Sequence, residues 1–182
     1  MAGKKSRQEK DIPMIQTVTP LDHYRLHIEF GSGSVLELNM KNRLRTTRYY
    51  DLNSDALFRS AVTDGTKIIF AAGSNDELEI FAREAVNMAM KAPGESMCIL
   101  RIQPLDGVRL RLEMKSGSIL MLNMANRLHT IRYSPLKEPE VLQAASTDGE
   151  NLFWGDVLKI DAEELTNLAL TVPPAGKENE AM

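Results

Sequence analysis

Residues 32–49 read SGSVLELNMKNRLRTTRY, and residues 116–133 read SGSILMLNMANRLHTIRY. The two stretches align without a gap at a constant offset of 84 positions, and thirteen of the eighteen aligned residues are identical. Weaker similarity extends on both sides of the two stretches, so one unit of sequence is present twice. The duplication predicts two copies of one small fold rather than a single large one.

The composition is that of an ordinary globular protein. Of 182 residues, 43% are hydrophobic and 26% are charged, and the formal net charge is −3. This net charge argues against a surface that is basic overall and binds nucleic acid, although it permits a local basic patch. The single cysteine, Cys98, excludes an internal disulfide framework and lies in an apolar run that indicates a buried thiol.

The sequence predicts a cytoplasmic protein without a membrane anchor. No apolar run approaches the roughly 18 residues of a transmembrane helix. The segment MAGKKSRQEK at the N-terminus is basic, but no apolar stretch follows it, so it does not resemble a secretory signal.

Each duplicated stretch begins with a predicted β-hairpin. Apolar residues alternate with polar ones on both sides of the Ser-Gly-Ser turn, as expected for strands with one buried face. Gly33 and Gly117 occupy the same position in the two turns, which indicates a backbone site with positive φ. The other face is not cleanly polar, because Val35, Ile119 and Met121 lie there, so we expect it to be partly covered, for example by the other repeat.

The remainder of each unit is predicted to contain short strands and a closing helix. Asp64-Gly65 and Asp148-Gly149 follow a threonine and precede apolar runs, a pattern typical of tight structural turns. In the second copy, Asp161 is placed to cap the last helix. The predicted fold class is therefore α+β, in which each unit is a small, mainly antiparallel sheet with a hairpin and a C-terminal helix.

The pattern divides the chain into five segments, and we expect the two units to dock about a pseudo-twofold axis. The predicted segments are a disordered tail at 1–12, unit 1 at 13–91, a linker at 92–97, unit 2 at 98–172 and a disordered tail at 173–182. A unit of about 75 residues is marginally stable alone, which favours docking.

The second half of the duplicated stretch, NRLxTxRY, concentrates basic residues. Its threonines and aromatic residues favour an extended conformation. The candidate residues for binding an anion or a partner are Arg43, Arg45, Arg48, Arg127 and Arg132. Guanidinium groups suit phosphate and carboxylate ligands. The alternative is that Arg48 and Arg132 hold each unit together by pairing with carboxylates such as Glu29 and Glu113 or Asp64 and Asp148.

Several motifs together resemble a bacterial family labelled domain of unknown function 2442. They are PLDxxRLxxEF, the SGS hairpin, NRLxTxRY, the TDG turn and an aromatic strand such as LFW, and they cover roughly residues 14–90 and 98–170. The first copy departs from the pattern with Phe70 where the second has Trp154. The resemblance implies a small α+β domain, here present as a tandem duplication, and brings no established activity. Some relatives resemble partners of other small proteins in arrangements like toxin–antitoxin pairs.

The chain shows little sign of catalytic or metal chemistry. His23 and His27 are four residues apart in a stretch that alternates like a strand, so their side chains would lie too far apart to share a metal ion. No nucleophile elbow or glycine-rich phosphate loop is present. We therefore predict no catalytic residue, no cofactor and no metal.

The leading functional hypothesis is a non-enzymatic protein-binding or regulatory module that recognises an unidentified protein through a sheet edge or a groove between the repeats. The first alternative is an anion or nucleic-acid binder that uses the arginine clusters. The second is an enzyme with a site at the repeat interface, which needs a pocket with convergent polar groups. No membrane partner is expected, and homo-oligomerisation is left open.

Overall fold

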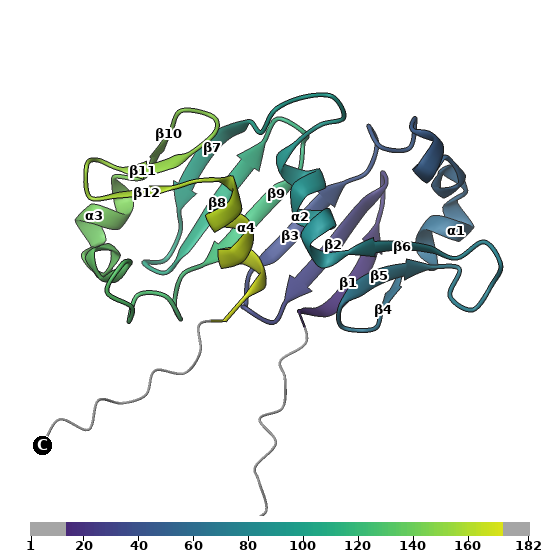
Figure 1. Ribbon diagram of the computed structural model, residues 1–182, viewed down its shortest axis with the longest axis horizontal. Helices are drawn as coiled ribbons and strands as arrows, with labels where there is room; N and C mark the ends of the chain where they lie inside the picture. Colours follow the sequence, from purple (N-terminus) through teal and green to yellow (C-terminus); the bar gives the residue numbers. More distant parts are fainter. Residues whose placement is uncertain (1–13, 173–182) are drawn as a thin grey trace, which may run out of the picture.

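A computed structural model describes residues 14–172, and its centre is one six-stranded antiparallel sheet (Figure 1). The strand order is β1-β2-β3-β9-β8-β7, so each half of the sheet comes from one unit. The strands are β1 (Ile15–Leu21), β2 (Arg25–Phe30), β3 (Val35–Asn39), β7 (Ile99–Pro104), β8 (Arg109–Met114) and β9 (Ile119–Asn123). The predicted tails, 1–12 and 173–182, lie outside the described residues.

Strands β3 and β9 join the two halves of the sheet. They pair antiparallel, with Leu36 opposite Leu120, Val35 opposite Met121 and Glu37 opposite Ile119. Leu36 and Leu120 are the same position of the duplicated stretch, and the pairs on either side of them are exchanged between the copies, with Val35 opposite the counterpart of Glu37.

The serines of the two SGS turns reach across this joint. The Ser34 hydroxyl accepts a hydrogen bond from the Asn123 amide at 3.1 Å, and the Ser118 hydroxyl accepts one from the Asn39 amide at 3.0 Å. Ser32 and Ser116, both buried, each donate to a carbonyl in the closing helix of the opposite unit, at Ala169 and Ala89 respectively. The SGS motif therefore satisfies polar groups between the units as well as turning the hairpin.

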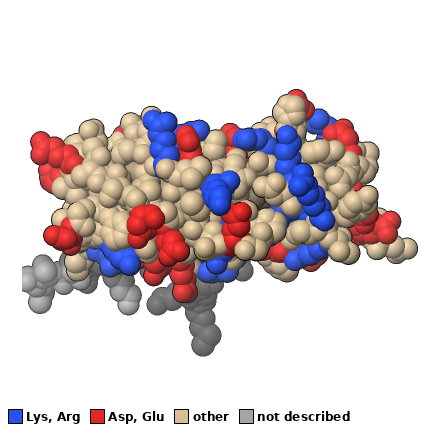
Figure 2. All heavy atoms as spheres, turned by 90° about the horizontal axis from the view of Figure 1, so that it is seen from above, with Lys and Arg blue, Asp and Glu red and all other residues tan. Residues whose placement is uncertain are grey.

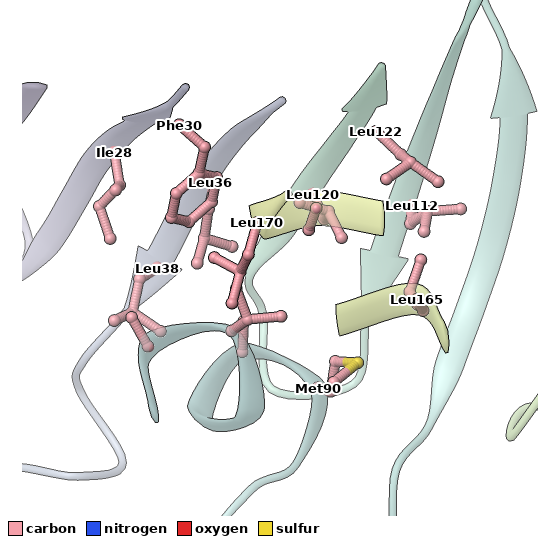
Figure 3. Packing of buried hydrophobic residues seen from close by; sticks show 14 of the residues in the cluster. Ile28, Phe30, Leu36, Leu38, Met90, Leu112, Leu120, Leu122, Leu165 and Leu170 are labelled. Atoms are coloured by element: carbon pink, nitrogen blue, oxygen red, sulfur yellow. The ribbon is translucent and has the colours of Figure 1, made fainter. Parts of the chain in front are cut away.

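Two closing helices, α2 (Ala82–Met90) and α4 (Ala162–Leu170), lie side by side on one face of the six-stranded sheet (Figure 1). Between helices and sheet lies a single hydrophobic core to which both units contribute (Figure 3). The core residues labelled in Figure 3 are Ile28, Phe30, Leu36, Leu38, Met90, Leu112, Leu120, Leu122, Leu165 and Leu170. The predicted units are thus halves of one core.

A small three-stranded sheet stands at each end of the molecule, preceded by short helices. In unit 1 the elements are the 3-10 helix η1 (Thr47–Asn53), α1 (Asp55–Arg59), β4 (Val62–Thr63), β5 (Lys67–Phe70) and β6 (Leu78–Phe81). In unit 2 they are the 3-10 helix η2 (Ser134–Lys137), α3 (Pro139–Gln143), β10 (Ser146–Thr147), β11 (Leu152–Trp154) and β12 (Leu158–Ile160). Within residues 14–172, no helix combines the length and the apolar character needed to cross a bilayer.

The turns predicted from the sequence are present. Gly33 and Gly117 both have φ of 81°, and Gly65 and Gly149 have φ of 97° and 98°. The Asp64 carboxylate accepts hydrogen bonds from the amides of residues 66 and 67, and Asp148 accepts from those of residues 150 and 151. Asp161 caps α4 by accepting from the Glu164 amide at 2.8 Å.

The predicted extended conformation of NRLxTxRY is wrong. Both copies fold into consecutive turns, and the first continues into η1. Thr46 explains the difference, because both its amide and its hydroxyl donate to the Arg43 carbonyl, and Thr130 does the same to Arg127. Local bonds from a threonine side chain here outweigh its intrinsic preference for strands.

Strand β1 includes Pro20, as β7 includes Pro104. One smaller expectation needs correction. Cys98 is half-buried rather than buried.

Candidate functional site

The first candidate site is the arginine cluster of unit 1, and its central member is clamped. Arg48 donates to both carboxylate oxygens of Glu84, at 2.6 and 3.1 Å, and to the Glu79 carbonyl at 3.0 Å. Tyr49 donates to Glu84 at 2.6 Å. Burial and this hydrogen bond raise the pKa of Tyr49 well above its ordinary value. Arg48 therefore connects η1 to β6 and to the first turn of α2. We call this arrangement of Arg48, Tyr49 and Glu84 the clamp.

Unit 2 contains the same clamp. Arg132 donates to both oxygens of Glu164, at 2.6 and 2.7 Å, and to the Lys159 carbonyl at 2.9 Å, and Tyr133 also donates to Glu164. Burial and the bond to Glu164 raise the pKa of Tyr133 to about 12. Burial alone would raise the pKa of Glu164, but the hydrogen bonds from Arg132 and Tyr133 outweigh it and lower that pKa.

The carboxylates named from the sequence as partners of Arg48 and Arg132 are the wrong ones. Asp64 and Asp148 bond within their own turns, while Glu29 and Glu113 lie on the sheet face opposite the helices. Sequence reasoning missed Glu84 and Glu164, although a signal existed. Both stand at the third residue of a closing helix, at matching positions of the two copies.

The remaining candidate arginines differ in their surroundings. Arg43 donates to the Lys91 carbonyl just after α2, and Arg127 donates to the Thr171 carbonyl and, at 2.6 Å, to the Thr171 hydroxyl just after α4. Burial lowers the pKa of both guanidinium groups. Each therefore satisfies a carbonyl at the C-terminal end of a helix, where positive charge is favoured. Arg45 is exposed and makes no side-chain hydrogen bond or ion pair with the described residues.

A metal site finds no support among residues 14–172, where no three metal-binding side chains of the His, Cys, Asp and Glu types gather. His23 lies in a turn with φ of 61°, while the His27 ring lies 3.6 Å from Glu29 on the sheet.

A groove of about 560 Å³ runs beside α2 in unit 1. Its polar lining includes Arg43, Arg83, Glu84, Lys91 and Glu95. The lining comes from α2 and its C-cap, from the segment 92–95 that follows, and from Arg43.

The second candidate surface is the face of the six-stranded sheet that α2 and α4 leave open. Val35, Ile119 and Met121 lie together on its two central strands, and each is half-buried. The second unit lies beside these residues, with its Met121 opposite Val35 across the joint, and leaves them partly exposed. The ion pairs Arg25–Glu37 and Arg111–Glu113 and the contact between His27 and Glu29 flank them on β2, β3 and β8.

Charges of both signs are interspersed over the molecule as seen from above (Figure 2). On that face Lys and Arg side chains gather in a band in the right half of the view, with Asp and Glu side chains nearby. No family model, curated protein or solved structure matches this chain.

Proposed function

We propose that this protein is a non-enzymatic protein-binding module that presents the open face of its six-stranded sheet to a partner. The observation that carries the proposal is the cluster of Val35, Ile119 and Met121 at the centre of that face. An apolar centre within a charged rim is the usual anatomy of a protein–protein interface.

The proposal includes a pseudo-twofold axis that relates the two units. Under this symmetry each unit contributes half of the open sheet face. Leu36 and Leu120, which occupy the same repeat position, face each other at the β3–β9 joint, and the serine hydrogen bonds cross it in both directions. The partner would therefore contact both copies at once.

The outer edges of the sheet are less suited to a partner strand. Edge strands β1 and β7 contain Pro20 and Pro104 and have irregular registers near Ile15 and Ile99. Proline and bulges on edge strands hinder the addition of another strand. This favours the face over the edge as the binding surface.

The motifs quoted above support membership of the domain-of-unknown-function family 2442, and this membership belongs to the proposal. A cytoplasmic location, expected from the sequence, belongs to it as well. The alternative of an anion site loses support at Arg48 and Arg132, because each holds a glutamate with two hydrogen bonds.

The test compares affinity capture from an extract of the native host by the full chain and by two variants. In the first, Val35→Glu and Met121→Glu place charge at the centre of the open face. In the second, Ile131→Glu adds charge at an isolated side chain that is 95% exposed. Far-UV circular dichroism verifies that both variants fold.

We expect a specific partner to be retained by the full chain and by Ile131→Glu, and to be lost with the face variant. Identical captured proteins for all three would contradict the proposal. So would the absence of any partner together with turnover of a metabolite by the purified protein.

A further inference from the structure

The outer sides of the two closing helices carry different charges. On α2 and its C-cap, the exposed stripe is Arg83, Asn87 and Lys91. The corresponding stripe of α4 is Glu163, Asn167 and Thr171. Two cations of unit 1 are thus replaced by an acid and a neutral residue in unit 2. The groove beside α2 lies where those cations gather.

The acidic residues of the groove are already engaged elsewhere. Glu84 is held by Arg48 and Tyr49, and Glu95 pairs with Lys115 at 3.0 Å. Among described residues, the side chain of Lys91 makes no ion pair or hydrogen bond. The groove therefore carries positive charge that neighbouring carboxylates leave largely uncompensated.

Arg43 and Arg83 add donors to the groove. Arg83 donates to the Asn167 side chain at 2.7 Å, a neutral partner that leaves its charge in place. Arg43 donates to the Lys91 carbonyl. Its counterpart Arg127 has the Thr171 hydroxyl as an additional acceptor, whereas Lys91 offers no side-chain acceptor.

We propose that this groove binds an oxyanion, the phosphate or carboxylate group of a small molecule, between Arg43, Arg83 and Lys91. Guanidinium and ammonium groups form charge-assisted hydrogen bonds with such oxygens. The volume of about 560 Å³ lies within the usual range for small-molecule sites, and the open shape leaves room for the rest of the ligand. The site is independent of the open sheet face.

Amide chemical shifts followed by NMR test this inference with the full chain at low ionic strength. Inorganic phosphate is titrated in one series and acetate in another. We expect saturable shifts at residues 91–95 with at least one of the two anions, and the anion that saturates at lower concentration identifies the ligand class. Added sodium chloride should weaken the binding.

Variants at the groove distinguish a site from general charge attraction. Lys91→Thr reproduces the residue of unit 2 and should weaken binding by about tenfold, or about 1.4 kcal/mol, because one charge-assisted hydrogen bond is lost. Arg83→Gln combined with Lys91→Thr should weaken it further. The matched control, Arg101→Gln with Lys137→Gln, removes the same charge at exposed residues of unit 2 and should leave the affinity unchanged.

Linear, unsaturated shifts with both anions would overturn the inference. An equal loss of affinity in the control and the groove variants would also overturn it, as would equal shifts around Thr171.

Discussion

Helices α2 and α4 occupy equivalent places over the sheet, yet they match only on their apolar inner sides and in the glutamate at their third residue. Glu84 and Glu164 make the same clamp with an arginine and a tyrosine. The outer sides differ, with Arg83 in one and Glu163 in the other. The two copies are alike where they build the joint and the core, and unlike where they meet solvent. Positions that are the same in both copies therefore have a structural role. Positions that differ are the candidates for a binding site.

The largest effect should come from breaking the joint. Leu36 and Leu120 are buried and lie opposite each other, so Leu36→Ala or Leu120→Ala should each lower the free energy of unfolding by about 2–5 kcal/mol. The double variant should lose less than the sum, because both changes enlarge one cavity. Urea unfolding measures this, with Leu100→Ala at an exposed site as the control. Strict additivity would argue against a shared cavity.

A smaller effect tests the glycine of the second SGS turn. Gly117 has φ of 81°, and a Cβ added there would lie 2.6 Å from Asn39 Nδ2, which donates across the joint to the Ser116 carbonyl. Gly107→Ala is the matched control, because Gly107 has φ of 77° and open space around it. The left-handed conformation costs an alanine about 1–2 kcal/mol at either site. Gly117→Ala should cost roughly 1 kcal/mol more, from the displaced hydrogen bond. Equal losses in urea unfolding would mean that this contact across the joint contributes nothing.

The smallest effect is the pH dependence of the clamp in unit 2. The raised pKa of Tyr133 means that its contribution to stability is complete below the ordinary tyrosine pKa of about 10 and is lost as pH rises through about 12. The lowered pKa of Glu164 means that its contribution is present above about pH 4.3 and is lost as pH falls through the folded-state pKa.

Tyr133→Phe should therefore flatten the alkaline fall in the urea midpoint relative to the unchanged protein. Tyr50→Phe, at an exposed tyrosine, is the control. Because Arg132 is about half exposed, its ion pair should contribute no more than about 1 kcal/mol. Parallel curves for the protein and Tyr133→Phe would contradict the clamp.

Local features of the fold could be predicted from the sequence, and contacts between distant segments could not. The hairpins and the turns at Gly33 and Asp64 depend on neighbouring residues, so their patterns are readable. The pairing of Leu36 with Leu120 depends on which strand edge the second copy meets, and periodicity carries no such information.

The partners of the arginine cluster could not be predicted for the same reason. Arg48 and its partner Glu84 are 36 positions apart, and only the fold brings them together. The turn structure of residues 41–46 was missed for another reason. Strand propensity is a weak preference, and the hydrogen bond from Thr46 to the Arg43 carbonyl reverses it locally.

The central claim is that the two copies form one core and unfold together, and Trp154 provides the most direct test. It is the single tryptophan, buried in unit 2, whereas Phe58 packs against Tyr24 and Phe70 in unit 1. Phe58→Ala should destabilise the protein by about 3–5 kcal/mol. Urea unfolding of this variant is followed by Trp154 fluorescence and by far-UV circular dichroism. One core predicts that both signals shift to the same lower urea concentration. A fluorescence transition that stays at its original position while the circular dichroism shifts would contradict the claim.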